Sequence, residues 1–335
     1  MTFKPETAVY TPPEVVSYGK KAIEDAKESE QRGLDIGIAE IRDYFAPLRP
    51  AQLGVILAQT SNYKTGMLHF LETAAIRQLK RQGRDDEILI HVSVEENIEE
   101  QAFLLLGREM GESAGELARG NVRNWDRLSQ AAIALGTIPI YRIGESMARA
   151  DDYPYLSISN MIRAIEPLQS GNLTDGKPKK IAGMFFDYLQ AFPFDDEVKR
   201  RGMRMDQRRL QVREDIYRLR QAAAYFDCPV WTAVQAKQEL KGAMGMIQLP
   251  GLYDAYETSE IASRADRMIS QWMPKMNHPL GTEVKHNGQY LFTVEENLIM
   301  FKVLKQKPGL PSGKSWLCRI DFDKNEIAPI TNERT

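Results

Sequence analysis

Cysteine and histidine are scarce in this sequence, and their positions indicate neither cross-links nor a metal centre. Only two of the 335 residues are cysteines, Cys228 and Cys318, and each lies inside an apolar run without a C-x-x-C partner. That arrangement indicates no disulfide framework and no zinc site. The four histidines are scattered without the spacing of metal ligands: His69, His91, His278 and His286.

Long hydrophobic runs and a strong net charge are also missing. No run of about 18 apolar residues occurs, so no transmembrane helix is indicated. The first residues, MTFKPETAVYTPPE, are polar and proline-rich and lack the apolar core of a signal peptide. We therefore expect a cytoplasmic protein without membrane contacts. The formal net charge is −2, so binding to nucleic acid would need a local basic patch.

The sequence does contain a series of short apolar runs separated by longer helical stretches. Amphipathic stretches lie at 65–82 and 206–226, and the runs are LGVILA (53–58), EILIHVS (87–93), IPIYRI (138–143), IAGMFFD (181–187), PVWTAV (229–234), ADRMISQWM (265–273), LIMFKVL (298–304) and SWLCRIDF (315–322). This alternation predicts an α/β fold with a mostly parallel twisted sheet and helices on both faces. Only KQKPGLPSGK separates the last two runs, which predicts an antiparallel hairpin at the sheet edge.

The N-terminal stretch from residue 14 to 32 is rich in charge and in helix-forming residues. A Thr-Pro-Pro precedes it and could start a helix. Its apolar face is thin, so such a helix should lie on another surface. Two interpretations remain open: a loosely packed N-terminal helix, or an arm that docks on a neighbouring subunit.

A phosphate site is indicated by LGVILAQTSNYKTGMLHF (53–70), where a buried strand is followed by a small polar loop and then an amphipathic helix. In such a loop the backbone N–H groups and the helix N-terminus face phosphates, a lysine reaches the β and γ oxygens, and a threonine hydroxyl holds Mg²⁺. The pattern assigns ATP binding to Ala58, Ser61, Asn62, Tyr63, Lys64 and Thr65, and Mg²⁺ binding to Thr65.

The loop departs from the pattern G-x-x-x-x-G-K-[ST] at both glycine positions, which hold Ala58 and Tyr63. At positive φ, Tyr63 would be strained by roughly 1–3 kcal/mol. In a helical conformation it would be tolerated and would cover the phosphates or a subunit seam. A similar segment, GLPSGKS (309–315), is one residue short and runs into an apolar strand, so we interpret it as the hairpin turn.

Polar residues follow three of the apolar strands. Asp187 ends one of them, at the position where Mg²⁺ is held beside a phosphate loop. Glu95 ends a second and could polarise the attacking water, although Glu95 and Glu96 could instead cap the next helix. Gln235 ends the third and could sense the γ-phosphate or be an ordinary loop residue. The three are expected to converge with Lys64 at one edge of the sheet.

These residues together resemble the C-terminal ATPase domain of DnaB-type replicative helicases, a RecA-like P-loop ATPase core. The matching segments are D-Y-L-Q (187–190), V-S-V-E-E (92–96), A-V-Q-A-K-Q (233–238), S-E-I-A-S-R-A-D-R-M-I (259–269) and V-L-K-Q-K-P-G-L-P-S-G (303–313). The resemblance implies catalytic roles for Glu95 and Gln235. It also places the cations that act on the neighbouring subunit's ATP at Lys305 and Lys307, although the family has an arginine where Lys307 stands.

The resemblance covers residues 33 to 330, which implies an N-terminal segment with a docking helix (1–32), a RecA-like ATPase domain (33–330) and a tail (331–335). The family's separate N-terminal domain has no counterpart in this sequence. The stretch 107–170 is longer than the family core needs. The implied function is that of a ring-forming, ATP-dependent DNA helicase or translocase, expected to be a hexamer, that hydrolyses ATP at subunit interfaces.

In this family the loops after the strands that end in Asp187 and Gln235 face single-stranded DNA. The residues implied for that contact are Arg200, Arg201, Arg204 and Lys241, whereas Arg208 and Arg209 could belong to the solvated face of the next helix. Two alternatives stay open. One is a nucleotide-binding scaffold that does not hydrolyse ATP, which Tyr63 and Lys307 would favour, and the other is a RecA-like recombination or repair ATPase.

Overall fold

The computed structural model describes residues 11–147, 156–171, 176–193, 208–238, 243–307, 309 and 313–330. The helices are α1 (Pro12–Arg32), α2 (Ala39–Arg42), α3 (Lys64–Arg81), α4 (Ile98–Met110), α5 (Ala114–Ala118), α6 (Trp125–Gly136), α7 (Ile158–Ser170), α9 (Arg208–Tyr225) and α10 (Glu260–Arg264). The short 3-10 helices are η3 (Leu189–Ala191) and η5 (Pro274–Met276).

The main sheet has nine strands in the order β11-β10-β9-β6-β1-β5-β4-β2-β3. Their bounds are β1 (Leu53–Ala58), β2 (Glu87–Ser93), β3 (Ile140–Ile143), β4 (Lys180–Asp187), β5 (Val230–Gln235), β6 (Arg267–Trp272), β9 (Leu298–Gln306), β10 (Ser315–Asp321) and β11 (Glu326–Pro329). The strands from β6 to β3 pair in parallel, and β9, β10 and β11 pair antiparallel at one side. The predicted α/β sheet and its antiparallel hairpin are confirmed.

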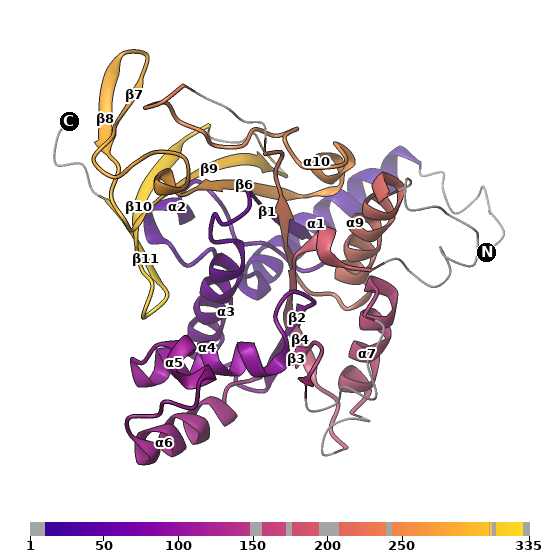
Figure 1. The fold of residues 1–335 in the computed structure, drawn as a ribbon. Helices are drawn as coiled ribbons and strands as arrows, with labels where there is room; N and C mark the ends of the chain where they lie inside the picture. Colours follow the sequence, from indigo (N-terminus) through magenta and orange to yellow (C-terminus); the bar gives the residue numbers. More distant parts are fainter. Residues whose placement is uncertain are drawn as a thin grey trace.

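Helices cover both faces of this sheet (Figure 1). On one face, α7, α9 and α10 bury apolar side chains against β1, β2, β4 and β5. On the other face, α2 and α3 pack with residues 34–48 against the sheet, β9 to β11 included. The central strands β1 and β2 are buried along their whole length, as expected for strands covered on both sides.

Two parts of the chain lie outside these layers. Helices α4, α5 and α6 form a separate lobe with a small apolar core of its own, and they account for much of the predicted surplus between 107 and 170 (Figure 1). The second part is a hairpin of β7 (Glu283–His286) and β8 (Gln289–Thr293), which projects beyond the antiparallel side of the sheet. Among the residues described, none of the helices combines the length and apolar character that a bilayer-spanning segment needs.

Helix α1 is present where the sequence predicts a helix, and its apolar side chains face outward. Val15, Val16, Tyr18 and Ile23 are all more than half exposed. The end of the helix is held by Arg32, which donates to the carboxylate of Asp227 at 2.7 Å. The described part of the chain therefore leaves the side chains of Val15, Val16 and Ile23 largely uncovered.

Candidate nucleotide site

The proposed phosphate loop connects the end of β1 to the first turn of α3. Its backbone bends twice into the left-handed region, at Ser61 with φ 62° and at Tyr63 with φ 63°. Tyr63 is the residue that precedes α3, and its ψ of 33° completes the left-handed conformation. A non-glycine residue there is strained by about 1–2 kcal/mol. Of the two conformations considered for Tyr63, the structure has the positive-φ one.

The Tyr63 ring folds back over the start of α3 and contacts the turn between β10 and β11. It lies so close to Gly66 that a β-carbon on that glycine would meet ring atoms at 2.3 Å. Phe322 packs edge-on against the ring at 5.5 Å between centroids, and the hydroxyl is hydrogen-bonded to the side-chain amide of Asn325. Burial raises the pKa of the Tyr63 hydroxyl to about 12, so the group stays neutral. These contacts offset the backbone strain.

The middle of the loop is anchored to the end of β6 through Asn62. The side-chain oxygen of Asn62 accepts from the backbone N–H of Met273 at 2.7 Å, and its backbone carbonyl accepts from Gln271 Nε2 at 2.6 Å. Asn62 is buried, so its side chain supports the loop from within the protein. Its backbone N–H also donates within the loop, to the carbonyl of Gln59 at 3.3 Å. Ala58, at the end of β1, is also buried, and its carbonyl accepts from Ala236 N–H.

Lys64 and Thr65 begin α3 beside two carboxylates. The Lys64 ammonium group donates to the backbone carbonyl of Gln59 at 3.2 Å and lies over the Tyr188 ring at 5.4 Å. Burial lowers the pKa of Lys64, while the charges of Glu95 and Asp187 raise it. The carboxylates that the sequence assigns to metal and to water activation are therefore both within electrostatic reach of this lysine.

Asp187 is fully buried at the end of β4. Burial raises the pKa of its carboxyl group, and the nearby Thr65 hydroxyl is the strongest effect that lowers it. Neither carboxylate oxygen has a hydrogen-bond partner of normal geometry among the described residues. A buried carboxylate whose oxygens lack hydrogen bonds of normal geometry suits a divalent cation, and carboxylate and hydroxyl oxygens are ligands that Mg²⁺ prefers. Thr65 and Asp187 therefore fit Mg²⁺ chemically.

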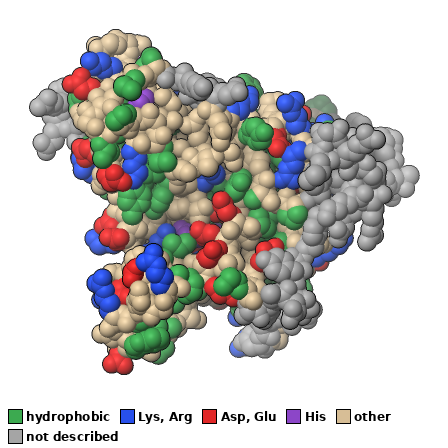
Figure 2. All heavy atoms as spheres, viewed as in Figure 1, with side chains coloured by type: hydrophobic (Ala, Val, Ile, Leu, Met, Phe, Trp, Pro, Cys, Tyr) green, Lys and Arg blue, Asp and Glu red, His purple; other side chains and the backbone are tan. Residues whose placement is uncertain are grey.

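Two glutamates follow β2 and line a cavity of about 450 Å³ together with Thr65. Burial raises the pKa of both, to about 7 for Glu96, and the charge of Asp187 raises both further. Neither residue caps the next helix, because α4 begins after Asn97, which forms a capping box with Glu100. The capping alternative is therefore wrong. Acidic side chains gather near the centre of this face, above the α4–α6 lobe (Figure 2).

Gln235 ends β5 and reaches the phosphate loop. Its side-chain amide donates to Thr60 Oγ1 at 3.0 Å. Its backbone N–H donates to the side-chain oxygen of Gln190 at 3.0 Å, and Gln190 Nε2 donates back to the carbonyl of Gln235 at 3.2 Å. Gln190 is the last residue of the D-Y-L-Q segment, so this pair links the ends of β4 and β5 to the loop.

Lys305 and Lys307 lie beside the amino ends of the parallel strands, whereas the phosphate loop lies at the carboxyl ends of these strands. Lys305 pairs with Met268 near the start of β6, whereas the loop follows the end of the parallel strand β1. The Lys305 ammonium group donates to the carbonyls of Ala262 and Ser263, and burial together with the charge of Lys307 lowers its pKa to about 8. Lys307 is exposed. Within one chain, this pair is not brought to the site.

Two further predictions concern the DNA contacts and the second segment that resembles a phosphate loop. The proposed DNA contacts Arg200, Arg201, Arg204 and Lys241 lie outside the described residues. The segment at 309–315 that resembles a phosphate loop leads into strand β10, which pairs antiparallel with β9, as predicted for the connection of a hairpin.

Three groups near the site are not identified by the sequence pattern. That pattern indicates Glu96 only as a cap, Gln190 only as part of a family motif, and the histidines as scattered. His69 and His91 in fact lie together with Glu72 in the protein interior. The only sequence signal for this group is the presence of polar residues at inward-facing positions of α3 and β2.

No family model and no curated protein matches this sequence. Solved structures match well. A DnaB-like replicative helicase, described with its interactions with primase, has a TM-score of 0.66 and 16% identity over 96% of this chain and 67% of that chain. Another structure, solved as an ATPase domain, has a TM-score of 0.65 and 15% identity over 96% of this chain and 99% of that domain. The chain therefore has the α/β fold of DnaB-type helicase ATPase domains.

Proposed function

We propose that this protein is an ATP-driven, ring-forming DNA helicase or translocase that hydrolyses ATP at subunit interfaces. The observation that carries the proposal is the convergence of a Lys-Thr helix start with Glu95, Asp187 and Gln235. They come from four different strand ends at one edge of the sheet, where parallel α/β folds bind their ligands. The neighbours with this fold include a DnaB-like replicative helicase.

Each residue in the site would have a defined task. Lys64 and the N–H groups at the start of α3 bind the phosphates, and Thr65 and Asp187 hold the Mg²⁺ that neutralises charge on the transferred phosphoryl group. Glu95 orients and deprotonates the attacking water. Glu96 lies beside it with a pKa of about 7, a suitable value for a general base, which makes Glu96 the matched comparison for Glu95 in a test of this role. Gln235 connects the phosphate loop to the strand ends.

A second copy of the chain would complete the site. Lys305 and Lys307 cannot reach their own phosphate loop because they lie at the opposite edge of the sheet. They could act on a neighbouring site if copies assemble head to tail, the arrangement that closes into a ring. The outward apolar side chains of α1 supply a further contact between copies. We therefore propose a homo-oligomer, with a hexamer as the expected closed form.

Single-stranded DNA would contact the loops after β4 and β5. A wide hollow of about 1050 Å³ lies between the start of α9 and residues 253–260. Basic and aromatic side chains line it, including Arg209, Arg213, Lys237, Tyr253 and Tyr256. Cationic groups follow the phosphates of a single strand, and aromatic rings stack with its bases. In the sequence, the lining residue Arg208 follows the segment that contains Arg200, Arg201 and Arg204, and the lining residue Lys237 precedes Lys241.

The test is an ATPase assay with and without single-stranded DNA. We expect turnover that DNA stimulates, and a loss of at least about 100-fold for Lys64→Ala and for Glu95→Gln. Glu96→Gln is the matched comparison: a larger loss there than in Glu95→Gln would move the water-activating role to Glu96. Wild-type protein that shows no turnover with any single strand would refute the motor.

A nucleotide-binding scaffold without hydrolysis is the second candidate. Tyr63 in place of the loop glycine and Lys307 in place of an arginine favour it, because a lysine lacks the bidentate fork of a guanidinium group. Such a scaffold would form nucleotide-dependent oligomers without releasing phosphate. A RecA-like recombination ATPase would hydrolyse ATP as well, but electron micrographs would show open filaments rather than closed rings.

A further inference from the structure

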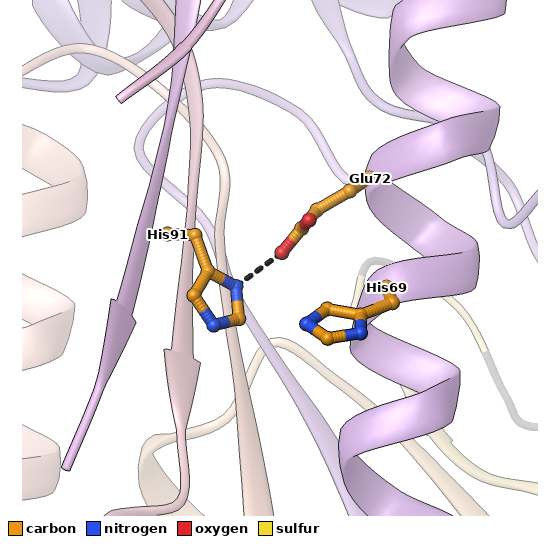
Figure 3. A group of neighbouring side chains, drawn as sticks. All are labelled: His69, Glu72 and His91. Carbon is orange, nitrogen blue, oxygen red and sulfur yellow. Dashed lines mark hydrogen bonds and ion pairs between the residues drawn. The ribbon is translucent and has the colours of Figure 1, made fainter. Parts of the chain in front are cut away.

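A group of buried polar side chains lies in the protein interior next to the candidate site, between α3, β2, β3 and α4. His69 and Glu72 project from α3 toward His91 on β2 (Figure 3). All three are at most 2% exposed. Glu72 accepts from His91 Nδ1 with one oxygen and from Arg142 with the other, at 3.1 Å. Arg108 lies 3.2 Å from His69 Nδ1.

One possible ligand atom from each of His69, Glu72 and His91, a ring nitrogen or a carboxylate oxygen, lies within 4.8 Å of the other two, as in a set of metal ligands. Their surroundings favour a different role. Arg108 and Arg142 already bring two positive charges, which match poorly with a divalent cation. If Arg108 donates to His69 Nδ1, the proton of the neutral imidazole is on Nε2, the nitrogen that would have to bind the metal. The charge of Glu72 is thus balanced by protein groups.

A continuous chain of hydrogen bonds leads from Glu72 to the turn that carries the two glutamates. Arg142 bonds Glu72 with one nitrogen and Gln101 Oε1 with the other, at 3.0 Å. Gln101 is fully buried on α4, and its Nε2 donates to the backbone carbonyl of Glu96 at 3.0 Å. The turn is also fixed from within, because Ser93 Oγ accepts from the N–H groups of Glu95 and Glu96.

Helix α3 links this network to the proposed magnesium position at its other end. Thr65, His69 and Glu72 are separated by four and three residues and so share one face of α3. Fixing Glu72 against β2 and β3 therefore fixes the direction in which Thr65 points. Groups that are packed and hydrogen-bonded from behind hold a reacting geometry far better than loops left to themselves.

We infer that Glu72, acting through Arg142 and Gln101, is a positioning residue that holds the Glu95–Glu96 turn at a fixed distance from the start of α3. This inference rests on the proposed ATPase function. It assigns no contact with substrate to Glu72. Loss of the network moves the glutamates relative to the phosphates, which lowers the rate of hydrolysis more than the binding of nucleotide.

Two variants test the inference, with a matched control. Gln101→Met removes the bond to the Glu96 carbonyl and keeps the pairing of Glu72 with Arg142, whereas Glu72→Gln removes the central charge. Glu87→Gln is the control: Glu87 is equally buried, holds Arg84 at 2.7 Å and Lys180 at 2.8 Å, and lies at the other end of β2. All three variants are compared by thermal unfolding, by kcat and KM for ATP, and by amide hydrogen exchange.

We expect kcat to fall about 10- to 100-fold in Gln101→Met and Glu72→Gln, with KM changed less than about threefold, because displacements of about 1 Å reduce rates on this scale. Amide exchange of residues 94–98 should rise about tenfold in both variants. Glu87→Gln should lower the unfolding temperature without either effect. Unchanged kcat and exchange in Gln101→Met, at any loss of stability, would overturn the inference.

The exchange measurement separates this inference from the proposed function. If wild-type protein hydrolyses no ATP, the motor proposal fails, while faster exchange at 94–98 in both variants still supports a network that positions the turn. Zinc added to chelator-treated protein provides the last check. A rise in unfolding temperature with zinc that is lost in His69→Ala would establish a metal site in place of the network.

Discussion

Tyr63 shows how a residue can occupy a position that usually needs glycine. Its left-handed backbone is unfavourable for any side chain. Burial of the ring against Gly66 and Phe322, with the hydrogen bond to Asn325, offsets that disadvantage. The ring is absent from the lining of the cavity beside Thr65 and Glu95. The Tyr63 ring therefore packs toward Phe322 and Asn325 and does not fill the cavity beside the two glutamates.

Substitutions at Tyr63 should separate the backbone strain from the side-chain contacts. We expect Tyr63→Gly to be more stable than Tyr63→Ala by about 1 kcal/mol, since both lack the ring and only alanine keeps the strained φ. Tyr63→Phe should lose about 1 kcal/mol relative to wild type, because only the hydrogen bond to Asn325 is removed. Urea unfolding measures all three. Equal stabilities for the glycine and alanine variants would show that this φ is not strained.

At the scale of elements, the contact between α3 and β2 is partly polar, and this makes it sensitive to acid. Burial lowers the pKa of His69 from 6.5 to about 3. As the pH falls below 6.5, the unfolded chain binds a proton at this residue and the folded chain does not. Stability contributed here is therefore present above pH 6.5 and is lost progressively below it.

The variant His69→Gln should remove this pH dependence. Between pH 6.5 and 5.5, wild-type protein is expected to lose up to about 1 kcal/mol more unfolding free energy than the variant. Urea unfolding at pH 7.5, 6.5 and 5.5 measures the difference. The pKa of Glu96 is raised, which has the opposite sign, but it is present in both proteins and cancels. Parallel pH profiles would contradict the assignment.

Long, strongly patterned elements were predictable from the sequence, and short ones were not. The strands β1, β2, β4 and β5 are buried over nearly their whole length and rich in apolar residues, so their existence and their order with α3 and α9 could be predicted. The hairpin β7–β8 and the edge strand β11 have only a few buried residues each. Their pairing depends on contacts with distant parts of the chain, which no local pattern contains.

In the candidate site too, residues with a local sequence pattern could be predicted, and residues brought together by packing could not. Lys64, Glu95, Asp187 and Gln235 could be placed because each ends a strand or begins a helix in a parallel sheet. The hydrogen-bond network of Glu72, Arg142 and Gln101 could not be predicted. These residues come from three elements whose packing the sequence alone does not define. The left-handed φ of Tyr63 likewise depends on the turn between β10 and β11, more than 250 residues further along the chain.

At the scale of the whole molecule, a mixture of two inactive variants tests whether neighbouring copies share a site. Lys64→Ala lacks the phosphate lysine and keeps Lys307, and Lys307→Ala is the reverse. We expect each alone to be inactive and the mixture to recover activity at about one interface in four, if copies assemble at random head to tail. A phosphate-release assay on mixed subunits measures this. A mixture as inactive as its parts would show that Lys307 does not act between copies.

The distance between the lysine pair and the phosphate loop has a consequence for control. Lys305 and Lys307 lie beside the amino ends of the parallel strands, and the loop lies at their carboxyl ends. Under the proposed function, a solitary copy would therefore hold two half-sites and no complete one. The protein concentration alone would then determine whether ATP is hydrolysed. Dilution would stop ATP hydrolysis without any inhibitor, and hydrolysis would begin only at concentrations at which the copies assemble.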